Sequence, residues 1–267
     1  MAIIVNPISP VAFSVFGIDV RWYALAYVAA FIVCFWLFTR MTREKNSQVI
    51  LDKKQYDDFM TAIILGVVIG GRLGYVLFYN LPYFISHPLE ILAVWHGGMS
   101  FHGGLLGLIT ANFLFAYRIH ISGWKLLDLA AVVTPIGLFF GRIANFINVE
   151  VMGRPSDAPW AMVFNGYTQV PRHPSPLYEA FGEGIVLFIL MYALYKKTNL
   201  RKHPGALSGI FGMLYATIRI ICEVFRAPDA QIGFLTSWGL TMGQLLSGLL
   251  FVAGAIITWI SFRKSRK

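Results

Sequence analysis

Seven long apolar stretches constrain the fold of this 267-residue chain more than any other feature. A helix that crosses the hydrocarbon core of a bilayer, about 30 Å thick, needs about 20 mainly apolar residues. Only 13% of the residues are charged, against about 25% in soluble domains, and the mean hydropathy is +0.64. We therefore expect an all-α, polytopic membrane protein that forms a single integral membrane domain over 1–267. The seven transmembrane helices are predicted at about 20–39, 59–79, 99–117, 126–147, 176–195, 205–225 and 241–262.

The positions of the basic residues predict how the chain is oriented. With the N-terminus outside, the cytoplasmic segments 40–58, 118–125, 196–204 and 263–267 contain 15 of the 22 basic residues, including all nine lysines. Because cytoplasmic loops carry an excess of Lys and Arg, we expect the N-terminus outside and the C-terminus in the cytoplasm. Insertion and contact with anionic lipid then explain the net charge of +9, and nucleic acid is not an expected partner.

The basic residues of the outer side are all arginines, the cation suited to bidentate recognition of phosphate or carboxylate. Two of them, Arg21 and Arg154, could equally snorkel at the interface. Cys34 and Cys222 lie within predicted spans, where a cysteine is usually a small apolar core residue. We find no zinc-type cluster, P-loop or dinucleotide fingerprint, so no metal and no cofactor are expected. The outer cations are Arg21, Arg72, Arg142, Arg154, Arg172, Arg219 and Arg226.

Arg72 lies inside a predicted span, where an ionisable group costs at least about 2.5–3.5 kcal/mol and is a functional candidate. It follows glycines spaced four apart, Gly66 and Gly70, with Gly74 next, and this spacing permits close helix approach. Either the glycines only pack and Arg72 pairs with an acid, or Arg72 contributes to an anion site.

A histidine surrounded by glycines marks the outer end of the third predicted span. Gly103 and Gly104 follow His102, and we expect this segment to expose backbone N–H groups and to let a ligand approach closely. Gly107 forms a further close-packing pair with Gly103. His102 is a candidate base or phosphate donor, because histidine is the side chain whose ordinary pKa is nearest neutral pH, although a merely hydrogen-bonded interfacial histidine would fit the same pattern.

The densest polar cluster, 141–154, lies where the fourth span leaves the membrane on the outer side. Arg142 and Asn145 are three residues apart and so share a helical face, which Asn148 continues. Glu150 lies just past the expected helix end. The Pro-rich segment 148–175 that follows is predicted to form a small periplasmic head for a protein substrate.

A charged stripe ends the sixth span. Tyr215, Arg219, Glu223 and Arg226 recur at helical spacing and must face the bundle interior or a wet cavity. Two arginines against one glutamate leave positive charge that a phosphate would neutralise. Arg142 and Arg219, with Arg72 or Arg226, are therefore predicted to line an anionic headgroup site open to the outer leaflet. Glu179 and Glu183 share one face of the preceding span.

These residues resemble the prolipoprotein diacylglyceryl transferase family of bacteria. Residues 141–153 fit that family's signature Gly-Arg-x-(Gly/Ala)-Asn-Phe-x-Asn-x-Glu-x-x-Gly at every specified position. Supporting matches occur in the family's order across nearly the whole chain, at 21–23, 70–75, 98–104, 172–175 and 219–229.

The resemblance implies a transferase of the bacterial inner membrane, with its active site toward the periplasm, that acts in lipoprotein biosynthesis and protein lipidation. It would move the diacylglyceryl group of phosphatidylglycerol to the lipobox cysteine of a prolipoprotein signal peptide, giving a thioether and glycerol phosphate. Arg142 and Arg219 would bind the lipid phosphate, and Asn145 and Glu150 would orient them. His102 would be the base or a headgroup donor, and Tyr23 and Tyr215 supporting donors. The other substrate-binding residues implied are Arg72, Gly103, Gly104, Gly153, Glu223 and Arg226.

The main alternative is a lipid or small-anion transporter. A transporter should carry charged residues along a path through the membrane and often has an internal repeat. Here the ionisable residues gather on the outer side and no repeat is found. An intramembrane protease would need an aspartate pair, a Ser/His pair or a His-Glu-x-x-His motif, and Asp128 is the only aspartate within a predicted span.

Overall fold

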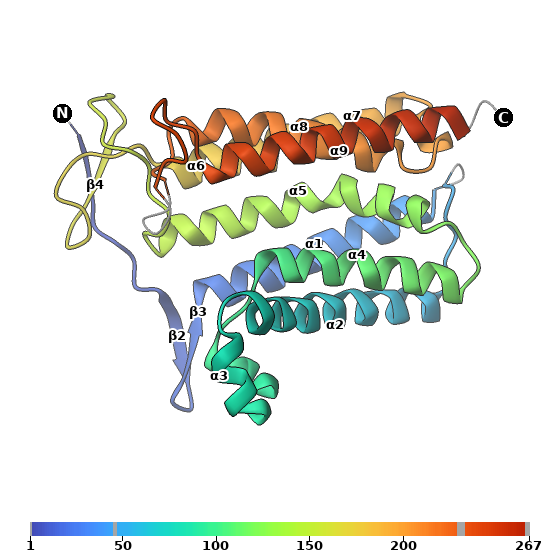
Figure 1. The fold of residues 1–267 in the computed structure, drawn as a ribbon, viewed down its shortest axis with the longest axis horizontal. Coiled ribbons are helices and arrows are strands. Elements are labelled where there is room, and N and C mark those ends of the chain that lie inside the picture. Colours follow the sequence, from blue (N-terminus) through green and yellow to red (C-terminus); the bar gives the residue numbers. More distant parts are fainter. Residues whose placement is uncertain (1, 45–46, 229–232, 265–267) are drawn as a thin grey trace. The chain divides into compact units, whose positions relative to one another are not determined.

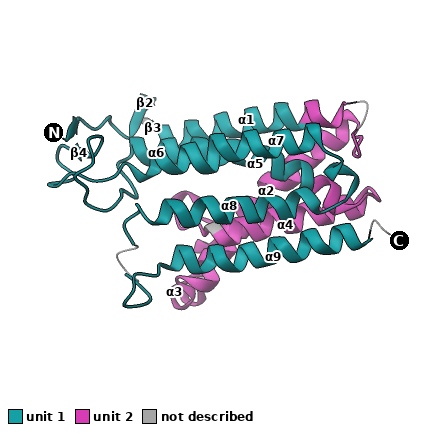
Figure 2. Cartoon of the chain, turned by 90° about the horizontal axis from the view of Figure 1, so that it is seen from above, with its two compact units in different colours: residues 1–38, 128–267 teal, residues 39–127 magenta. Residues whose placement is uncertain are grey.

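The computed structural model of the chain describes residues 2–44, 47–228 and 233–264, and Figure 1 shows its fold. Of the residues used above, Lys45, Asp229, Arg266 and Lys267 lie outside the described ranges. The chain divides into two compact units, one formed by residues 1–38 and 128–267 and the other by residues 39–127 (Figure 2). The single membrane domain stays a prediction.

Six helices of the described chain are long and apolar enough to cross a membrane. They coincide with six of the seven predicted spans, so a mostly helical membrane protein is confirmed. One of them is continuous over three elements, α6 Ser175–Glu179, a π-helical turn Ala180–Val186 and α7 Leu187–Lys197. The other five are α1 Trp22–Thr42, α2 Lys53–Phe78, α5 Gly123–Ile147, α8 Ala206–Glu223 and α9 Met242–Lys264.

The remaining predicted span, the third at 99–117, is also helical, as α4 Phe101–Arg118, but it is not among these six. It has 18 residues, and His102, Asn112 and Arg118 lower its hydropathy. The count of seven transmembrane helices and the side on which each terminus lies therefore stay predictions.

Glycines bring α2 and α4 together in the unit formed by residues 39–127. A Cβ atom built on Gly66 would lie 2.6 Å from the Gly107 carbonyl oxygen, and one built on Gly74 would lie 2.7 Å from the Gly103 Cα. No side chain fits at such distances, so the close packing predicted from this glycine spacing is confirmed. Three short helices lead from α2 to α4: α3 Leu81–Ser86 and the 3₁₀ helices Pro88–Leu92 and Val94–His96.

Helix ends explain where two of the spans begin. The α2 helix begins six residues before the predicted span because Asp52 and Gln55 form a capping box, with Asp52 Oδ1 accepting from Gln55 N at 2.8 Å. In the other unit, the buried carboxylate of Asp128 accepts from Gly205 N at 2.7 Å and Ser208 N at 2.8 Å, at the start of α8. A 3₁₀ turn, Leu200–Lys202, connects α7 to α8.

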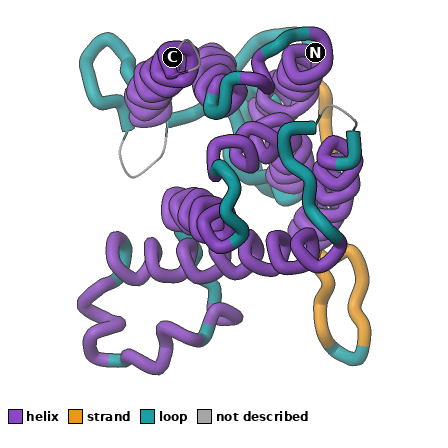
Figure 3. Tube along the Cα trace, turned by 90° about the vertical axis from the view of Figure 1, so that its right-hand side faces the viewer, coloured by secondary structure: helices purple, strands orange, loops and turns teal. Residues whose placement is uncertain are grey.

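Four short strands in the described ranges were not expected from the sequence. β1 Ile3–Val5 pairs in parallel with β4 Met162–Phe164, so residues near the N-terminus form part of the segment predicted as the head (Figure 1). β2 Val11–Val15 and β3 Ile18–Arg21 form an antiparallel hairpin, which Figure 3 draws in orange. The strands are too short for the alternating pattern that reveals longer strands in a sequence.

Candidate functional site

An ion-pair network joins α5, the α6 to α7 span and α8. Three arginines and three glutamates form it: Arg142, Arg219, Arg226, Glu179, Glu183 and Glu223. The structure therefore brings Arg142 and Arg219 together through shared carboxylates, as expected of two residues of one site.

Two buried carboxylates hold the two principal arginines. Arg142 Nη1 lies 2.8 Å from Glu179 Oε2, and Arg142 Nη2 lies 3.1 Å from Glu183 Oε2. Arg219 Nη1 lies 2.8 Å from Glu179 Oε1 and 3.3 Å from Glu183 Oε1. Each carboxylate thus links both guanidinium groups, which fixes their separation and orientation.

Glu223 extends the network toward α9. It accepts hydrogen bonds from Arg219, one turn earlier on α8, and from Thr241 Oγ1, at 2.8 Å from Glu223 Oε2. Arg226 Nη1 lies 3.2 Å from Glu179 Oε1. A cavity of about 40 Å³ lies beside Arg219, Glu223 and Arg226. Since one water needs at least about 10–15 Å³, this cavity holds only a few water molecules.

The expectation of uncompensated positive charge on the α8 stripe is wrong. Glu179 and Glu183 come from a different span and complete the pairing, so among the described residues three cations face three anions. The accessible part of the network is nevertheless positive. The side chains of Arg142 and Arg219 are 19% and 12% exposed, while both partner glutamate side chains are 0% exposed. An anion that approaches this site meets guanidinium edges with the carboxylates behind them.

The two glutamates lie at and within the π-helical turn Ala180–Val186. Such single turns are rare in proteins, and those that occur are often found at functional sites. Glu179 ends α6 and Glu183 lies within the turn, and both are fully buried. Two glutamates in an apolar span are costly unless they are paired, and this signal could have assigned them to the site. The Thr241-x-x-Gln244 capping box could likewise have placed Thr241 at a helix start.

In the signature segment 141–153, side chains near the end of α5 contact Glu150. Asn145 Nδ2 donates to Glu150 Oε2 at 2.9 Å, and Asn148 Nδ2 lies 3.3 Å from Glu150 Oε1. Val149 and Val151, on either side of Glu150, have φ values of 56° and 53°. A β-branched residue in this left-handed region is strained, so the loop holds Glu150 in place at a conformational cost. The described partners of Arg142 and Arg219 are the other glutamates, and the orienting role of Asn145 and Glu150 stays a prediction.

Gly153 lies where three chain segments cross. Its N–H donates to the His173 carbonyl at 2.9 Å, and its carbonyl accepts from Arg172 Nη1 at 3.0 Å. A Cβ built there would lie 2.6 Å from the carbonyl oxygens of both His173 and Phe225. Backbone crowding therefore explains the glycine, and its role in binding substrate stays a prediction. Arg154 Nε, next to it, donates to the Arg226 carbonyl at 2.9 Å.

The two predicted tyrosine donors lie on different helices of the same unit. Tyr23 is near the start of α1, with its ring 5.1 Å from the ring of Tyr27. Tyr215 is one turn before Arg219 on α8 and stacks on Phe211, with ring centroids 6.0 Å apart.

His102, Gly103 and Gly104 occupy the first turn of α4 in the other unit. Ser100 caps this helix: its Oγ accepts from Gly103 N at 3.2 Å, and its carbonyl accepts from Gly104 N at 2.9 Å. The capping residue therefore uses the N–H groups of Gly103 and Gly104, and the role of these glycines in binding substrate stays a prediction. The His102 side chain is exposed.

Arg72 organises the segment that leads to His102. The residue is 5% exposed, and its guanidinium donates to backbone carbonyls, with Nε 2.9 Å from Ile91 O and Nη2 3.1 Å from Ala93 O. It also donates to Glu90, Gly97 and Gly98. The alternative in which Arg72 pairs with an acid is wrong among the described contacts, because the printed partners are backbone carbonyl groups of the segment 90–98. Substrate binding by Arg72 stays a prediction.

Comparisons with known proteins match nearly the whole chain. Residues 10–260 match a family model described as prolipoprotein diacylglyceryl transferase. A phosphatidylglycerol–prolipoprotein diacylglyceryl transferase of Azospirillum brasilense is 49% identical over 269 residues, which cover 100% of this chain and 98% of that protein. Proteins of the same name from Rhodospirillum rubrum and Rhodospirillum centenum are 48% and 50% identical, over 96% of this chain and 93% and 91% of theirs.

Proposed function

The chain belongs to the prolipoprotein diacylglyceryl transferase family, and we propose that it transfers the diacylglyceryl group of phosphatidylglycerol to the lipobox cysteine of a prolipoprotein. The products are a thioether-linked lipid on the cysteine and glycerol phosphate. The names of the relatives favour this transferase over the lipid or small-anion transporter.

The observation that carries the proposal is the arrangement of the ion-pair network. Buried carboxylates hold the guanidinium groups of Arg142 and Arg219 in fixed positions, and only the guanidinium side is accessible. Such preorganised donors stabilise charge that develops on a leaving group, because they need no rearrangement during the reaction. The proposed role of Arg142 and Arg219 is to bind the phosphate of the donor lipid.

The transfer is a substitution at the glycerol carbon that carries the phosphate ester. The cysteine sulfur of the prolipoprotein forms a bond to this carbon, the carbon–oxygen bond breaks, and its electron pair goes to the phosphate oxygen. The leaving glycerol phosphate gains negative charge, which the arginines neutralise. The thiol, with a pKa of about 8.5, must lose its proton because the thiolate is the nucleophile.

The remaining predicted roles complete the proposal. His102 takes the thiol proton or donates to the headgroup, and Asn145 and Glu150 orient the arginines. Tyr23 and Tyr215 act as supporting hydrogen-bond donors. The enzyme needs no catalytic cysteine of its own, since the nucleophile belongs to the substrate.

We also propose seven transmembrane spans, with α4 as the additional one beside the six most apolar helices. The N-terminus lies outside and the C-terminus in the cytoplasm of a bacterial inner membrane. The active site faces the periplasm, where segment 148–175 forms the head that receives the signal peptide of the precursor. The excess of lysine and arginine in the four segments between or after these spans supports this orientation.

The test is a transfer assay with purified protein, phosphatidylglycerol and a lipobox peptide. Mass spectrometry of the peptide should show a diacylglyceryl adduct on its cysteine. We expect Arg142→Ala to lower the rate by about 10²–10³-fold, as the loss of one preorganised donor does. The matched control Arg118→Ala, at the C-terminal end of α4, should keep the wild-type rate. A peptide that stays unmodified with ample lipid would favour the transporter.

A further inference from the structure

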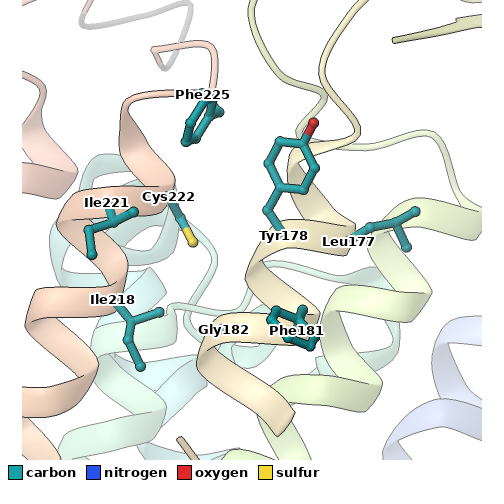
Figure 4. A pocket seen from close by; sticks show the side chains of 8 residues that line it. All are labelled: Leu177, Tyr178, Phe181, Gly182, Ile218, Ile221, Cys222 and Phe225. Carbon is teal, nitrogen blue, oxygen red and sulfur yellow. The ribbon is translucent and has the colours of Figure 1, made fainter. Parts of the chain in front are cut away.

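An apolar groove runs between the α6 to α7 span and α8 (Figure 4). It has a volume of about 380 Å³, within the range of about 300–1,000 Å³ typical of ligand sites. Phe181 and Ile221, at its edges, are 61% and 57% exposed. Both helices are membrane spans, so these edges face the hydrocarbon of the bilayer. The residues used below are Leu177, Phe181, Gly182, Ile218, Cys222 and Phe225.

The groove and the ion-pair network lie on adjacent faces of α8. Ile218 and Cys222 are four residues apart on this helix, and Phe225 follows three residues later, in the turn just after the helix ends. Arg219, Glu223 and Arg226 follow the same spacing one residue later, a rotation of about 100°. On the α6 to α7 span, the groove is lined by Phe181 and Gly182, which lie in the sequence between the two glutamates that hold the arginines. A molecule in the groove is therefore a neighbour of the predicted phosphate site.

Aromatic side chains with polar atoms close the end of the groove next to segment 148–175. Tyr178 Oη accepts from Trp160 Nε1 at 2.7 Å and lies 3.1 Å from His173 Nδ1. The rings of His173 and Phe225 are 5.1 Å apart. Aromatic rings with a polar edge are typical of the membrane–water interface. The groove thus leads from the interface into the hydrocarbon region, as a lipid tail does.

We propose that this groove binds one acyl chain of the donor phospholipid, an inference that rests on the proposed function. Its apolar walls offer few hydrogen-bond partners deeper in the membrane, so a polar ligand would lose the bonds it makes in water. The volume is too small for a helix of the protein substrate. A cylinder of about 11 Å diameter fills about 380 Å³ in about 4 Å, less than the 5.4 Å of one helical turn. An extended hydrocarbon chain fits the same volume.

A variant that fills the groove tests the proposal. A Cβ built on Gly182 would lie 2.7 Å from Ile218 Cγ2, so the backbone at Gly182 leaves no room beside the Ile218 side chain. A larger side chain at position 218 must therefore extend into the groove. We compare Ile218→Trp with the control Ile189→Trp, at a position that is 59% exposed on α7. Transfer rates are measured with dioleoyl and dihexanoyl phosphatidylglycerol at equal mole fraction in detergent micelles.

Each methylene that is buried strengthens binding up to about fourfold, so the wild type should prefer the long-chain lipid. Ile218→Trp should lower kcat/KM at least tenfold with the dioleoyl lipid and less than twofold with the dihexanoyl lipid. Ile189→Trp should behave as the wild type. If Ile218→Trp has the same ratio of kcat/KM for the dioleoyl lipid to kcat/KM for the dihexanoyl lipid as the wild type, the groove proposal is overturned and the proposed function is not. A wild-type protein that transfers from neither lipid overturns the proposed function and the groove with it.

A binding measurement needs neither turnover nor a substitution in the groove. In the Cys34→Ala background, Cys222 is the single cysteine of the chain, and its sulfur points into the groove (Figure 4). Alkylation by N-ethylmaleimide, followed by intact-protein mass spectrometry, should be slowed at least threefold by dioleoyl phosphatidylglycerol. Glycerol phosphate, which has no acyl chain, should leave the rate unchanged. Equal rates with and without the dioleoyl lipid overturn the proposal.

Discussion

Arg219 Nη1 lies 2.8 Å from Glu179 Oε1, an atom of a carboxylate that has no solvent-exposed surface. The same oxygen lies 3.2 Å from Arg226 Nη1, and the other carboxylate oxygen lies 2.8 Å from Arg142 Nη1. One buried glutamate therefore contacts three guanidinium groups. A buried charge is tolerated only when it is paired, so the glutamate and the arginines depend on one another.

Replacing Glu179 with Gln keeps the size of the side chain and removes its charge. Removing one partner of a buried ion pair typically costs about 3–5 kcal/mol, and we expect a loss of stability of this size. The arginines also lose the partner that fixes them, so transfer should fall more than tenfold. Thermal unfolding in detergent and the peptide transfer assay measure the two effects.

The matched control is Glu90→Gln, because Glu90 pairs with His96 at 2.9 Å on the surface. Exposed pairs contribute about 0–1 kcal/mol, so stability should change little. If both variants were equally stable, the network would not depend on Glu179.

We expect His102→Gln to abolish thioether formation while binding of phosphatidylglycerol survives, if His102 is the base. General bases contribute about 10²–10⁴-fold to rates. Equilibrium binding of the lipid and single-turnover transfer separate the two roles. An equal loss of binding would assign His102 to the headgroup, and His96→Gln, with a side chain that is 59% exposed, is the control that should retain both activities.

The hydrophobic pattern alone located the membrane helices, because each apolar stretch is longer than a soluble helix would need. The sequence also predicted that Arg142 and Arg219 lie near the ends of their spans, and they lie five and four residues before the last residues of α5 and α8. The partners of these arginines were not predicted, because Glu179 and Glu183 come from another span and pairing between distant segments leaves no local spacing. The same limit applies to β1 and β4, which are 157 to 161 residues apart along the chain.

The partners of Arg72 could not be predicted from the sequence either. An arginine in an apolar span suggests an acidic partner, but the structure surrounds it with carbonyl groups. Carbonyl partners leave no trace in the sequence, since every residue has one. Only the glycines at 97 and 98, both with positive φ, hint that the chain folds tightly there.

Arg72→Lys should loosen the segment 88–98 while the charge is kept. Lysine has three donors at one point, whereas the five donors of arginine form a planar fork, so lysine cannot bind carbonyls spread over nine residues. Hydrogen exchange measured by mass spectrometry should show faster exchange in 88–100. Arg118→Lys, at an exposed position, should not change it, and an unaltered pattern in Arg72→Lys would contradict the ordering role.

The segment around His173 should lose stability in mild acid. Desolvation lowers the pKa of His173 below its usual 6.5, so the folded protein holds the neutral form where the unfolded chain binds a proton. Stability is therefore present above pH 6.5 and falls as the pH drops from 6.5 toward the lowered value. Limited proteolysis of segment 154–175 between pH 8 and 5 measures this, and His173→Gln should flatten the dependence.

The packing of α2 against α4 predicts opposite effects for the same substitution at two glycines. In an open helix, Gly→Ala stabilises by about 0.8–1.0 kcal/mol, and a Cβ at Gly248 meets no atom within 4 Å. A Cβ at Gly107 would collide with the Gly66 carbonyl and lie 3.0 Å from the Gly70 Cα, so α2 must move away. We expect Gly248→Ala to keep or raise the melting temperature and Gly107→Ala to lower it. Gly66 and Gly107 share one contact, so Gly66→Ala should lower the melting temperature less in the Gly107→Ala background than in the wild type. Equal losses in the two backgrounds would show that the two glycines do not meet.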